Sequence, residues 1–154
     1  MSKRYRPCAG VMLVNQAGLV FTGQRRDKTT PAWQMPQGGI DAGEAPRAAA
    51  LRELEEETGV APSKVEIIAQ SQEPLRYDFP TDLADTFGKG KYRGQEQHWF
   101  LMRFLGVDAD INIETEHPEF SHWRWAQPSD LVPGIVAFKR DLYEKVLAEF
   151  GPLI

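Results

Sequence analysis

The sequence has one cysteine, Cys8, and only three histidines among its 154 residues. A lone cysteine cannot form a disulfide within the chain, and such a composition fits a reducing compartment. The same shortage argues against a zinc site, because zinc in proteins is usually held by cysteine and histidine side chains. We therefore expect any metal chemistry of this protein to rely on oxygen ligands.

Long apolar runs are also missing. No segment approaches the length of a membrane span, and residues 1–7 lack the apolar run of a signal peptide. The net charge is −4, which argues against binding duplex DNA through a broad basic surface. We expect a cytoplasmic protein without membrane contact, folded as one domain over residues 1–154. Its oligomeric state stays open, with a monomer favoured.

Strand and helix patterns alternate along the chain. Residues 8–14 and 19–25 flank a turn and predict a β-hairpin. Other predicted strands span residues 65–70, 74–79, 97–105 and 122–126. Residues 80–94 predict a glycine-containing loop, residues 128–131 a helical turn, and residues 138–150 an amphipathic helix. This mixture predicts an α/β fold in which helices cover a mixed sheet.

The most informative segment is residues 38–60, where seven residues follow a fixed spacing. They are Gly38, Glu44, Arg52, Glu53, Glu56, Glu57 and Gly59, in the pattern G-x5-E-x7-R-E-U-x-E-E-x-G-U, in which U is aliphatic. Pro46 is suited to the first turn of a helix, and Gly59 to its end. On this predicted helix the last three glutamates fall within about 100° of one face.

Three carboxylates on one helix face repel each other, by about 0.2–0.5 kcal/mol for each pair one turn apart. A bound divalent cation removes this repulsion, and oxygen ligands favour Mg²⁺, Mn²⁺ or Ca²⁺ over softer metals. Arg52 is placed one turn before Glu56 and can orient it or compensate its charge. The alternative, a solvated acidic helix face, leaves the spacing of the glycines and of Glu44 unexplained. We therefore predict a Mg²⁺ site, at which Mn²⁺ can substitute.

With this segment, the sequence resembles the Nudix hydrolase family. Further motifs resemble one branch of it, the bacterial RNA pyrophosphohydrolases and the dinucleoside polyphosphate hydrolases. They are Tyr5-Arg6-Pro7, Trp33-Gln34-Met35-Pro36-Gln37-Gly38-Gly39, Arg76-Tyr77-Asp78-Phe79-Pro80, Gly94-Gln95-Glu96-Gln97-His98-Trp99-Phe100, Pro118-Glu119-Phe120, Trp123-Arg124-Trp125 and Phe138-Lys139-Arg140. The resemblance implies the Nudix fold, an α/β/α sandwich around a mixed β-sheet. It also implies Mg²⁺-dependent hydrolysis of a nucleoside diphosphate linked to another group.

The resemblance also implies roles for individual residues. The catalytic set it points to is Arg52, Glu53, Glu56, Glu57 and Glu119. The four glutamates of this set are the implied metal ligands, together with the backbone carbonyl of Gly38. Glu119 either completes the metal site, acts as the general base, or is merely an exposed loop carboxylate, so the base is either Glu56 or Glu119. Glu44 is expected to have a structural role.

Substrate contacts are predicted at Arg6, Arg25, Arg26, Tyr77, Lys91 and Phe138. Arg6 resembles a phosphate-binding arginine of the branch. Either Arg25 or Arg26 is expected to face the cleft. Tyr77 and Lys91 are candidates for a terminal phosphate. Phe138 either stacks on a nucleobase, a contact worth about 1–3 kcal/mol, or is a core residue of the C-terminal helix. The tryptophans are expected mainly in the core.

Several functions remain open at this stage. The first is removal of pyrophosphate from the 5′-triphosphate end of single-stranded RNA, which initiates mRNA decay. The second is hydrolysis of a dinucleoside polyphosphate, such as diadenosine tetraphosphate, to ATP and AMP. Hydrolysis of non-standard nucleoside triphosphates is a third possibility. A non-catalytic nucleotide sensor is an alternative of another class, although a sensor has no need of three crowded carboxylates.

Overall fold

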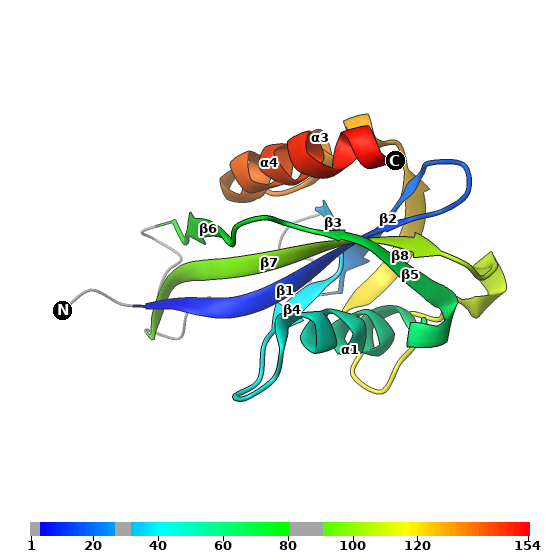
Figure 1. Cartoon of the computed structure of the whole chain (residues 1–154), viewed down its shortest axis with the longest axis horizontal. Helices are drawn as coiled ribbons and strands as arrows, with labels where there is room; N and C mark the ends of the chain where they lie inside the picture. Colours follow the sequence, from blue (N-terminus) through cyan, green and yellow to red (C-terminus); the bar gives the residue numbers. More distant parts are fainter. Residues whose placement is uncertain (1–3, 27–31, 81–90) are drawn as a thin grey trace.

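A mixed β-sheet forms the centre of the molecule, and helices cover both of its faces (Figure 1). The computed structural model describes residues 4–26, 32–80 and 91–154. Its strands are β1 (Arg4–Val14), β2 (Val20–Arg25), β3 (Trp33–Gln34), β4 (Gln37–Gly39), β5 (Val65–Gln70), β6 (Leu75–Asp78), β7 (Tyr92–Phe104) and β8 (Phe120–Ala126). Its α-helices are α1 (Pro46–Thr58), α3 (Leu131–Gly134) and α4 (Arg140–Phe150). None of the described helices is long and apolar enough to cross a membrane.

The two longest strands, β1 and β7, run parallel at the centre of the sheet, and the other pairings are antiparallel. Strand β7 pairs with β6 toward its start and with β5 toward its end. Strand β1 pairs with β4 from Cys8 to Gly10 and meets β2 only where Val14 lies opposite Val20. The predicted hairpin is therefore confirmed, but the pairing of its two strands is short, because β4 occupies part of the same edge of β1. Strand β2 also pairs along its length with β8 and, at Gly23 and Gln24, with β3.

Alternate residues of the central strands enter two separate cores. On β7, Trp99 and Leu101 belong to the core below α3 and α4, whereas Phe100 and Met102 belong to the core above α1. Helix α4 contributes Leu142 to the first core, so the predicted amphipathic helix is confirmed. The three layers are visible in Figure 1, and they confirm the predicted α/β/α sandwich.

The predicted strands and the helical turn are otherwise found close to their expected places. The exception is the loop predicted at residues 80–94. Residues 81–90, which include Lys89, lie outside the described residues, but residues 92–94 are the start of β7. Gly94 is required there for a reason other than a loop. A Cβ atom on it would lie 1.8 Å from the carbonyl oxygen of Tyr77, so only glycine lets β6 approach β7 this closely.

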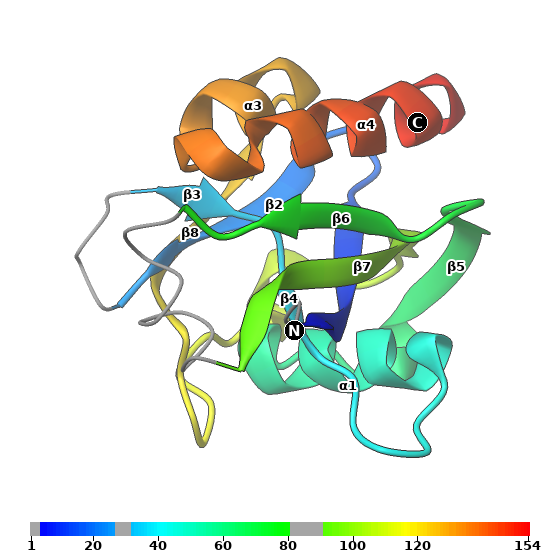
Figure 2. The ribbon, with the colours of Figure 1, turned by 90° about the vertical axis from the view of Figure 1, so that its left-hand side faces the viewer.

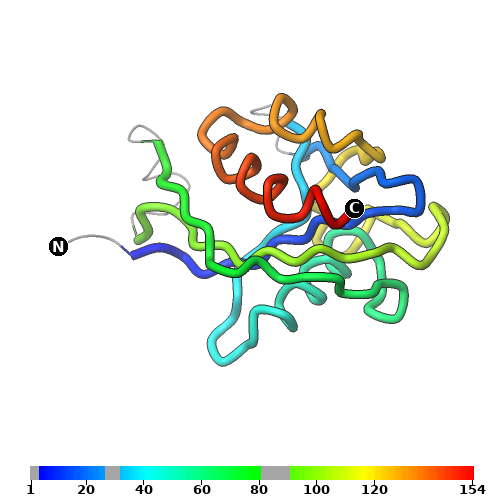
Figure 3. The backbone as a smooth tube through the Cα atoms, turned by 45° about the horizontal axis from the view of Figure 1, so that its top comes forward, coloured from blue at the N-terminus to red at the C-terminus, as the bar shows by residue number. Residues whose placement is uncertain are grey.

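The two ends of β1 have different surroundings. At its C-terminal end, the last residues of the chain return to the β1–β2 turn, where a Cβ on Gly18 would lie 3.6 Å from Ile154 (Figure 3). The N-terminal end of β1 lies at the open end of the sheet, beside β6 and β7 (Figure 2).

Among the tryptophans, Trp99 is fully buried as expected, while Trp123 and Trp125 pack half-buried against the core above α1.

Candidate active site

Helix α1 turns two members of its acidic face, Glu53 and Glu57, toward the rest of the molecule. Ala49, Ala50 and Leu54 are fully buried in the core above α1 and fix the rotation of the helix. Gly59 ends the helix with a left-handed φ of 74°, and its N–H donates to the carbonyl of Glu55. Glu57 is consequently only 4% exposed. A simple solvated acidic face, the alternative left open by the sequence, is therefore excluded for this residue.

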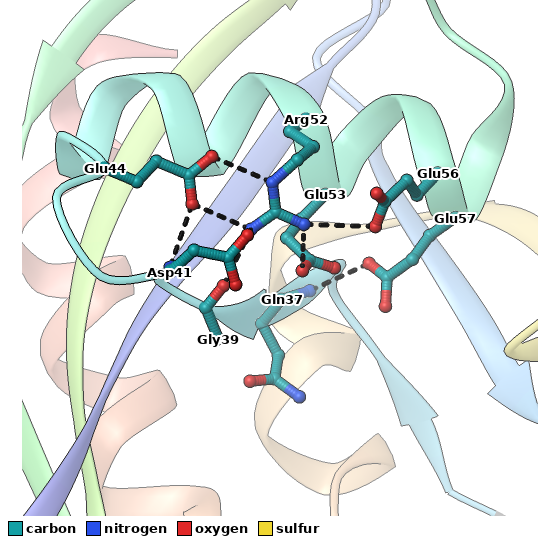
Figure 4. Close-up of polar contacts among 8 residues, drawn as sticks. All are labelled: Gln37, Gly39, Asp41, Glu44, Arg52, Glu53, Glu56 and Glu57. Carbon is teal, nitrogen blue, oxygen red and sulfur yellow. Dashed lines mark hydrogen bonds and ion pairs between the residues drawn. The ribbon is translucent and has the colours of Figure 1, made fainter.

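Glu57 is the most buried carboxylate of the site. The backbone N–H of Gln37 donates to its Oε2 at 3.1 Å (Figure 4). Burial raises the pKa of Glu57 well above its ordinary value, and the nearby carboxylates of Glu53 and Glu119 raise it further. A carboxylate in this position ionises at a high free-energy cost unless a cation accompanies it.

The carboxylate of Glu53 packs against Gly38 of strand β4. A Cβ atom on Gly38 would fall 2.1 Å from the carboxyl carbon of Glu53, so the absence of a side chain at residue 38 makes room for this carboxylate. Burial raises the pKa of Glu53, although the hydrogen bond from Arg52 opposes that shift. The backbone of Gly38 and the half-buried carboxylate of Glu53 therefore border the same space as Glu57.

Arg52 ties the loop after β4 to the helix (Figure 4). Its Nε donates to Glu44 Oε2 at 2.8 Å, and its Nη2 donates to Glu44 Oε1 and to the carbonyl of Gly39, both at 2.9 Å. Glu44 also accepts the backbone N–H of Asp41 at 3.0 Å. The hydrogen bonds from Arg52 are the main cause that lowers the pKa of Glu44 to about 2. These contacts fit the structural role expected for Glu44.

The third nitrogen of the Arg52 guanidinium, Nη1, donates hydrogen bonds to carboxylates of the acidic face. Its Nη1 donates to Glu53 Oε1 at 2.8 Å and to Glu56 Oε2 at 3.2 Å. The side chain of Glu56 is 57% exposed, so one of its oxygens stays accessible from solvent. Arg52 thus compensates part of the negative charge and orients both carboxylates.

Glu119 faces this helix from the other wall of a cavity of about 410 Å³. The residues that line the cavity are Glu53, Glu55, Glu56, Glu57, Thr115, Glu116, His117 and Glu119. A second cavity of about 370 Å³ is lined by Arg25, Arg26, Pro118 and Glu119. The backbone N–H of Arg26 donates to the carbonyl of Glu119 at 3.0 Å, which holds the end of β2 beside the loop. Glu119 therefore lies between an acidic cavity and a basic one.

The acidic cavity suits a hard divalent cation. Its walls offer carboxylate oxygens, which are the ligands that Mg²⁺ and Mn²⁺ prefer. Among residues 4–26, 32–80 and 91–154, no three acidic or histidine side chains converge closely enough to enclose an ion by themselves. Mg²⁺ usually keeps several waters and binds through one or two carboxylates plus substrate phosphates, so this open arrangement fits it.

The predicted substrate residues lie in several places. The Arg6 guanidinium covers Gly39, where a Cβ atom would meet its Nη2 at 2.4 Å. Tyr77 is buried in the core below α4, with its ring centre 5.8 Å from that of Phe138. Phe138 is half-buried against the same core, so it is partly a core residue, as its alternative stated. Lys91 is exposed just before β7.

Lys139 is a functional candidate that sequence reasoning missed. It is only 8% exposed, and its Nζ lies 5.6 Å from the centre of the Tyr77 ring. Burial, and to a lesser degree Arg25, lower the pKa of Lys139 to about 8. Lysine side chains are rarely buried in proteins. The burial of Lys139 therefore indicates a polar site next to Tyr77, in the otherwise apolar layer between α4 and the sheet. The only sequence signal was its place within Phe138-Lys139-Arg140, in a segment that otherwise predicted a surface helix.

Other missed residues come from the loop before β8. Thr115, Glu116 and His117 line the acidic cavity, and the buried Oγ1 of Thr115 has no hydrogen-bond partner within the described part of the chain. The neighbouring motif Pro118-Glu119-Phe120 was the only signal near them. These residues add polar groups to the wall opposite α1.

We expect Gly38→Ala to reduce activity at least about tenfold while the protein stays folded. The new Cβ would displace the Glu53 carboxylate, which can rotate away because it is the end of a flexible side chain. The steady-state rate in Mg²⁺ and the melting temperature would be measured together. Gly151→Ala is the matched control, since a Cβ there meets no atom within 4 Å. Normal activity of Gly38→Ala would contradict the prediction, because it would show that activity does not require the Glu53 carboxylate beside Gly38.

Comparison with known proteins gives a consistent result. The family model described as the NUDIX domain matches residues 4–146. An RNA pyrophosphohydrolase from Roseobacter denitrificans is 64% identical over 146 residues, which cover 95% of this chain and 91% of that protein. An RNA pyrophosphohydrolase from Sphingopyxis alaskensis is 57% identical over 150 residues, which cover 97% of this chain and 95% of that protein.

Solved structures with the same fold are more distant in sequence. A Caenorhabditis elegans Ap4A hydrolase in a binary complex superposes with a TM-score of 0.67 at 20% identity, covering 94% of this chain and 98% of that one. The Escherichia coli dihydroneopterin triphosphate pyrophosphohydrolase superposes with a TM-score of 0.72 at 21% identity, covering 96% and 99%. At such identities the likeness concerns the fold alone.

Proposed function

The chain belongs to the Nudix hydrolase family, and we propose that it removes pyrophosphate from the 5′-triphosphate end of single-stranded RNA. The observation that carries this proposal is the identity of 64% with an RNA pyrophosphohydrolase along nearly the whole chain. The site supports it independently, because an acidic cavity for metal ions adjoins a basic cavity for phosphate groups. Conversion of the 5′-triphosphate end to a 5′-monophosphate, with release of pyrophosphate, would initiate decay of the RNA.

We propose Mg²⁺ as the metal, since the family typically uses a divalent cation and the cavity offers hard oxygen ligands. The ligands proposed for one or more Mg²⁺ ions are the carboxylates of Glu53, Glu56 and Glu57 and the carbonyl of Gly38, shared among the ions. Glu119 would either complete the metal site or act as the general base. When bound, Mg²⁺ supplies charge neutralisation for the phosphoanhydride and a more acidic water. We propose that the chain acts as a monomer with one domain over residues 1–154.

The chain's own residues would position the substrate around this centre. Arg25 or Arg26 would bind phosphate oxygens in the basic cavity that Glu119 borders. Arg6, beside Gly39, would bind the phosphates from the other side of the loop. Arg52 keeps Glu53 and Glu56 oriented through its hydrogen bonds. A glutamate, either Glu56 or Glu119, then accepts the proton of the attacking water.

The nucleotide itself would lie toward α4. Lys139 and Tyr77 form a polar and aromatic site there, and the half-buried Phe138 borders it. A base stacked against such an aromatic ring gains about 1–3 kcal/mol. Tyr77 and Lys91 remain proposed contacts of a terminal phosphate.

The decisive experiment compares two substrates under the same conditions. We would measure kcat/KM in Mg²⁺ for a short 5′-triphosphate single-stranded RNA and for diadenosine tetraphosphate, with Glu56→Gln as the inactive reference. We expect the RNA to be preferred, with pyrophosphate released. A preference for the dinucleotide would make the protein a dinucleoside polyphosphate hydrolase instead. Activity on neither substrate above the reference would favour a nucleotide sensor.

A further inference from the structure

Charged side chains surround Tyr5 near the N-terminal end of β1. This end of β1 lies at the open end of the sheet (Figure 2). We call this cluster the edge patch. It consists of Tyr5, Arg76, Asp78 and Arg93, together with the exposed Lys91 two residues before Arg93. None of these residues contributes to the acidic or the basic cavity. Tyr77 faces the core below α4, so its strand neighbours Arg76 and Asp78 project from the opposite face of the sheet.

The centre of the edge patch is held together by specific contacts. The Tyr5 hydroxyl donates to Asp78 Oδ1 at 2.5 Å, and Arg93 Nη2 donates to Asp78 Oδ2 at 2.8 Å. The guanidinium carbons of Arg76 and Arg93 lie 4.8 Å and 5.0 Å from the centre of the Tyr5 ring. Gly94 lies between Tyr5 and Asp78 in the sheet, so no side chain separates them. Both guanidinium groups are thereby fixed in position.

The edge patch is positively charged although the chain as a whole is negative. Its three cations, Arg76, Lys91 and Arg93, outnumber the carboxylates of Asp78 and of Glu96, the partner of Arg76 at 3.4 Å. The side chains of Arg76 and Arg93 remain 59% and 45% exposed, and Lys91 is exposed as well. These cations can therefore be reached by a ligand without breaking the contacts around Tyr5.

The edge patch and the predicted phosphate contacts share the same strand ends. Arg6 follows Tyr5 on β1, and Tyr77 lies between Arg76 and Asp78 on β6, in each case on the other face of the sheet. A ligand held by Arg6 and Tyr77 would thus lie on the opposite face of the sheet from the edge patch, near the same strand ends. A ligand long enough to pass the open end of the sheet would reach both.

We propose that the edge patch binds the backbone of the RNA nucleotides that follow the 5′ end. This inference rests on the proposed RNA pyrophosphohydrolase function and extends it, because it makes substrate length a determinant of binding. Phosphate groups pair with exposed arginine and lysine side chains, and unstacked RNA bases also stack on guanidinium planes. The two arginines fixed beside Tyr5 offer both kinds of contact.

The test compares two RNA lengths. We would measure kcat and KM for a 5′-triphosphate dinucleotide and for a 5′-triphosphate single strand of about eight nucleotides, a length typical of single-strand grooves. Each would be measured at about 50 and 200 mM salt, a range over which phosphate contacts lose much of their strength. The test variant is Arg76→Gln/Arg93→Gln. The matched control is Lys64→Gln/Arg103→Gln, which removes two half-exposed, ion-paired cations elsewhere on the protein.

We expect the normal protein to favour the longer RNA. The test variant should lose about tenfold in kcat/KM on that RNA through KM, and the salt dependence of log kcat/KM should flatten by about 1.4. Its activity on the dinucleotide should change less than twofold, and the control should behave like the normal protein.

Two results would overturn the inference and leave the proposed function intact. One is equal kcat/KM for both RNA lengths in the normal protein. The other is an equal loss on both lengths in the test variant, which would make the edge patch structural. Hydrolysis of neither RNA would overturn the proposed function and this inference with it.

Discussion

Glu57→Gln should abolish most activity and at the same time stabilise the metal-free protein. The substitution removes a negative charge from a side chain that is 4% exposed. The amide oxygen of glutamine can still accept the hydrogen bond from the Gln37 backbone, so the packing is kept. Loss of a group that only supports a metal ligand already costs about 10–100-fold, and we expect at least about 10²-fold for this proposed ligand.

The gain in stability follows from the raised pKa of Glu57. Each unit by which burial raises a pKa corresponds to about 1.4 kcal/mol of unfavourable ionisation. For a chain of this length, about 1 kcal/mol shifts the melting temperature by about 2–4 °C. We therefore expect the melting temperature in EDTA near neutral pH to rise by several degrees in Glu57→Gln.

The sign of the pH dependence provides a second measurement. The pKa of Glu57 is higher in the folded than in the unfolded state, where it is about 4.5. The folded protein therefore binds more protons above pH 4.5, and this contribution to stability is lost as pH rises toward the folded pKa. The melting temperature of the metal-free protein should fall over this range, and Glu57→Gln should remove that part of the slope. Mg²⁺ should restore stability to the unsubstituted protein only.

Glu144→Gln is the control for these measurements, because Glu144 is an exposed glutamate on α4. It should change neither activity nor the pH dependence. A clear fall in the metal-free melting temperature of Glu57→Gln would contradict our interpretation, since it would mean that the ionised side chain stabilises the fold.

The acidic helix could be predicted from the sequence because its information is local. Glu53, Glu56 and Glu57 share a face as a direct consequence of helical spacing, and Gly59 marks the end. The burial of Glu57 could not be predicted, because it depends on how the sheet, including β4 with Gln37, packs against α1. Local spacing gives the orientation of side chains on a helix but not what covers them.

Contacts between segments that are distant in the sequence could be predicted less well. The pairing of β2 with β8 joins residues about one hundred positions apart, and no local pattern indicated it, whereas the nearby turn did indicate the short pairing of β1 with β2. Glu119 was identified only through the resemblance to a family, not through any pattern around it. Lys139 was missed because a lysine within an amphipathic segment predicts a solvated position, and only the neighbours from other elements bury it.

The general base is the role that sequence left undecided between Glu56 and Glu119, and the structure distinguishes their surroundings. Glu56 accepts a hydrogen bond from Arg52 on the helix that carries the other acidic residues. Glu119 is exposed, comes from the opposite wall, and borders the basic cavity as well. We infer that Glu56 acts mainly as a metal ligand, and that Glu119 accepts the proton of the attacking water.

Glu119→Gln should therefore lower kcat by about 10²–10⁴-fold, the usual contribution of a general base, with little change in the Mg²⁺ concentration for half-maximal activity. Glu56→Gln should raise that Mg²⁺ concentration strongly and also reduce kcat. Glu119→Gln should further lose the acid limb of the pH–rate profile, because that limb reports deprotonation of the base. If Glu56→Gln lost the acid limb and Glu119→Gln shifted the Mg²⁺ requirement, the two roles would be exchanged. Since the two glutamates approach the cavity from opposite walls, that result would also reverse the side from which water attacks.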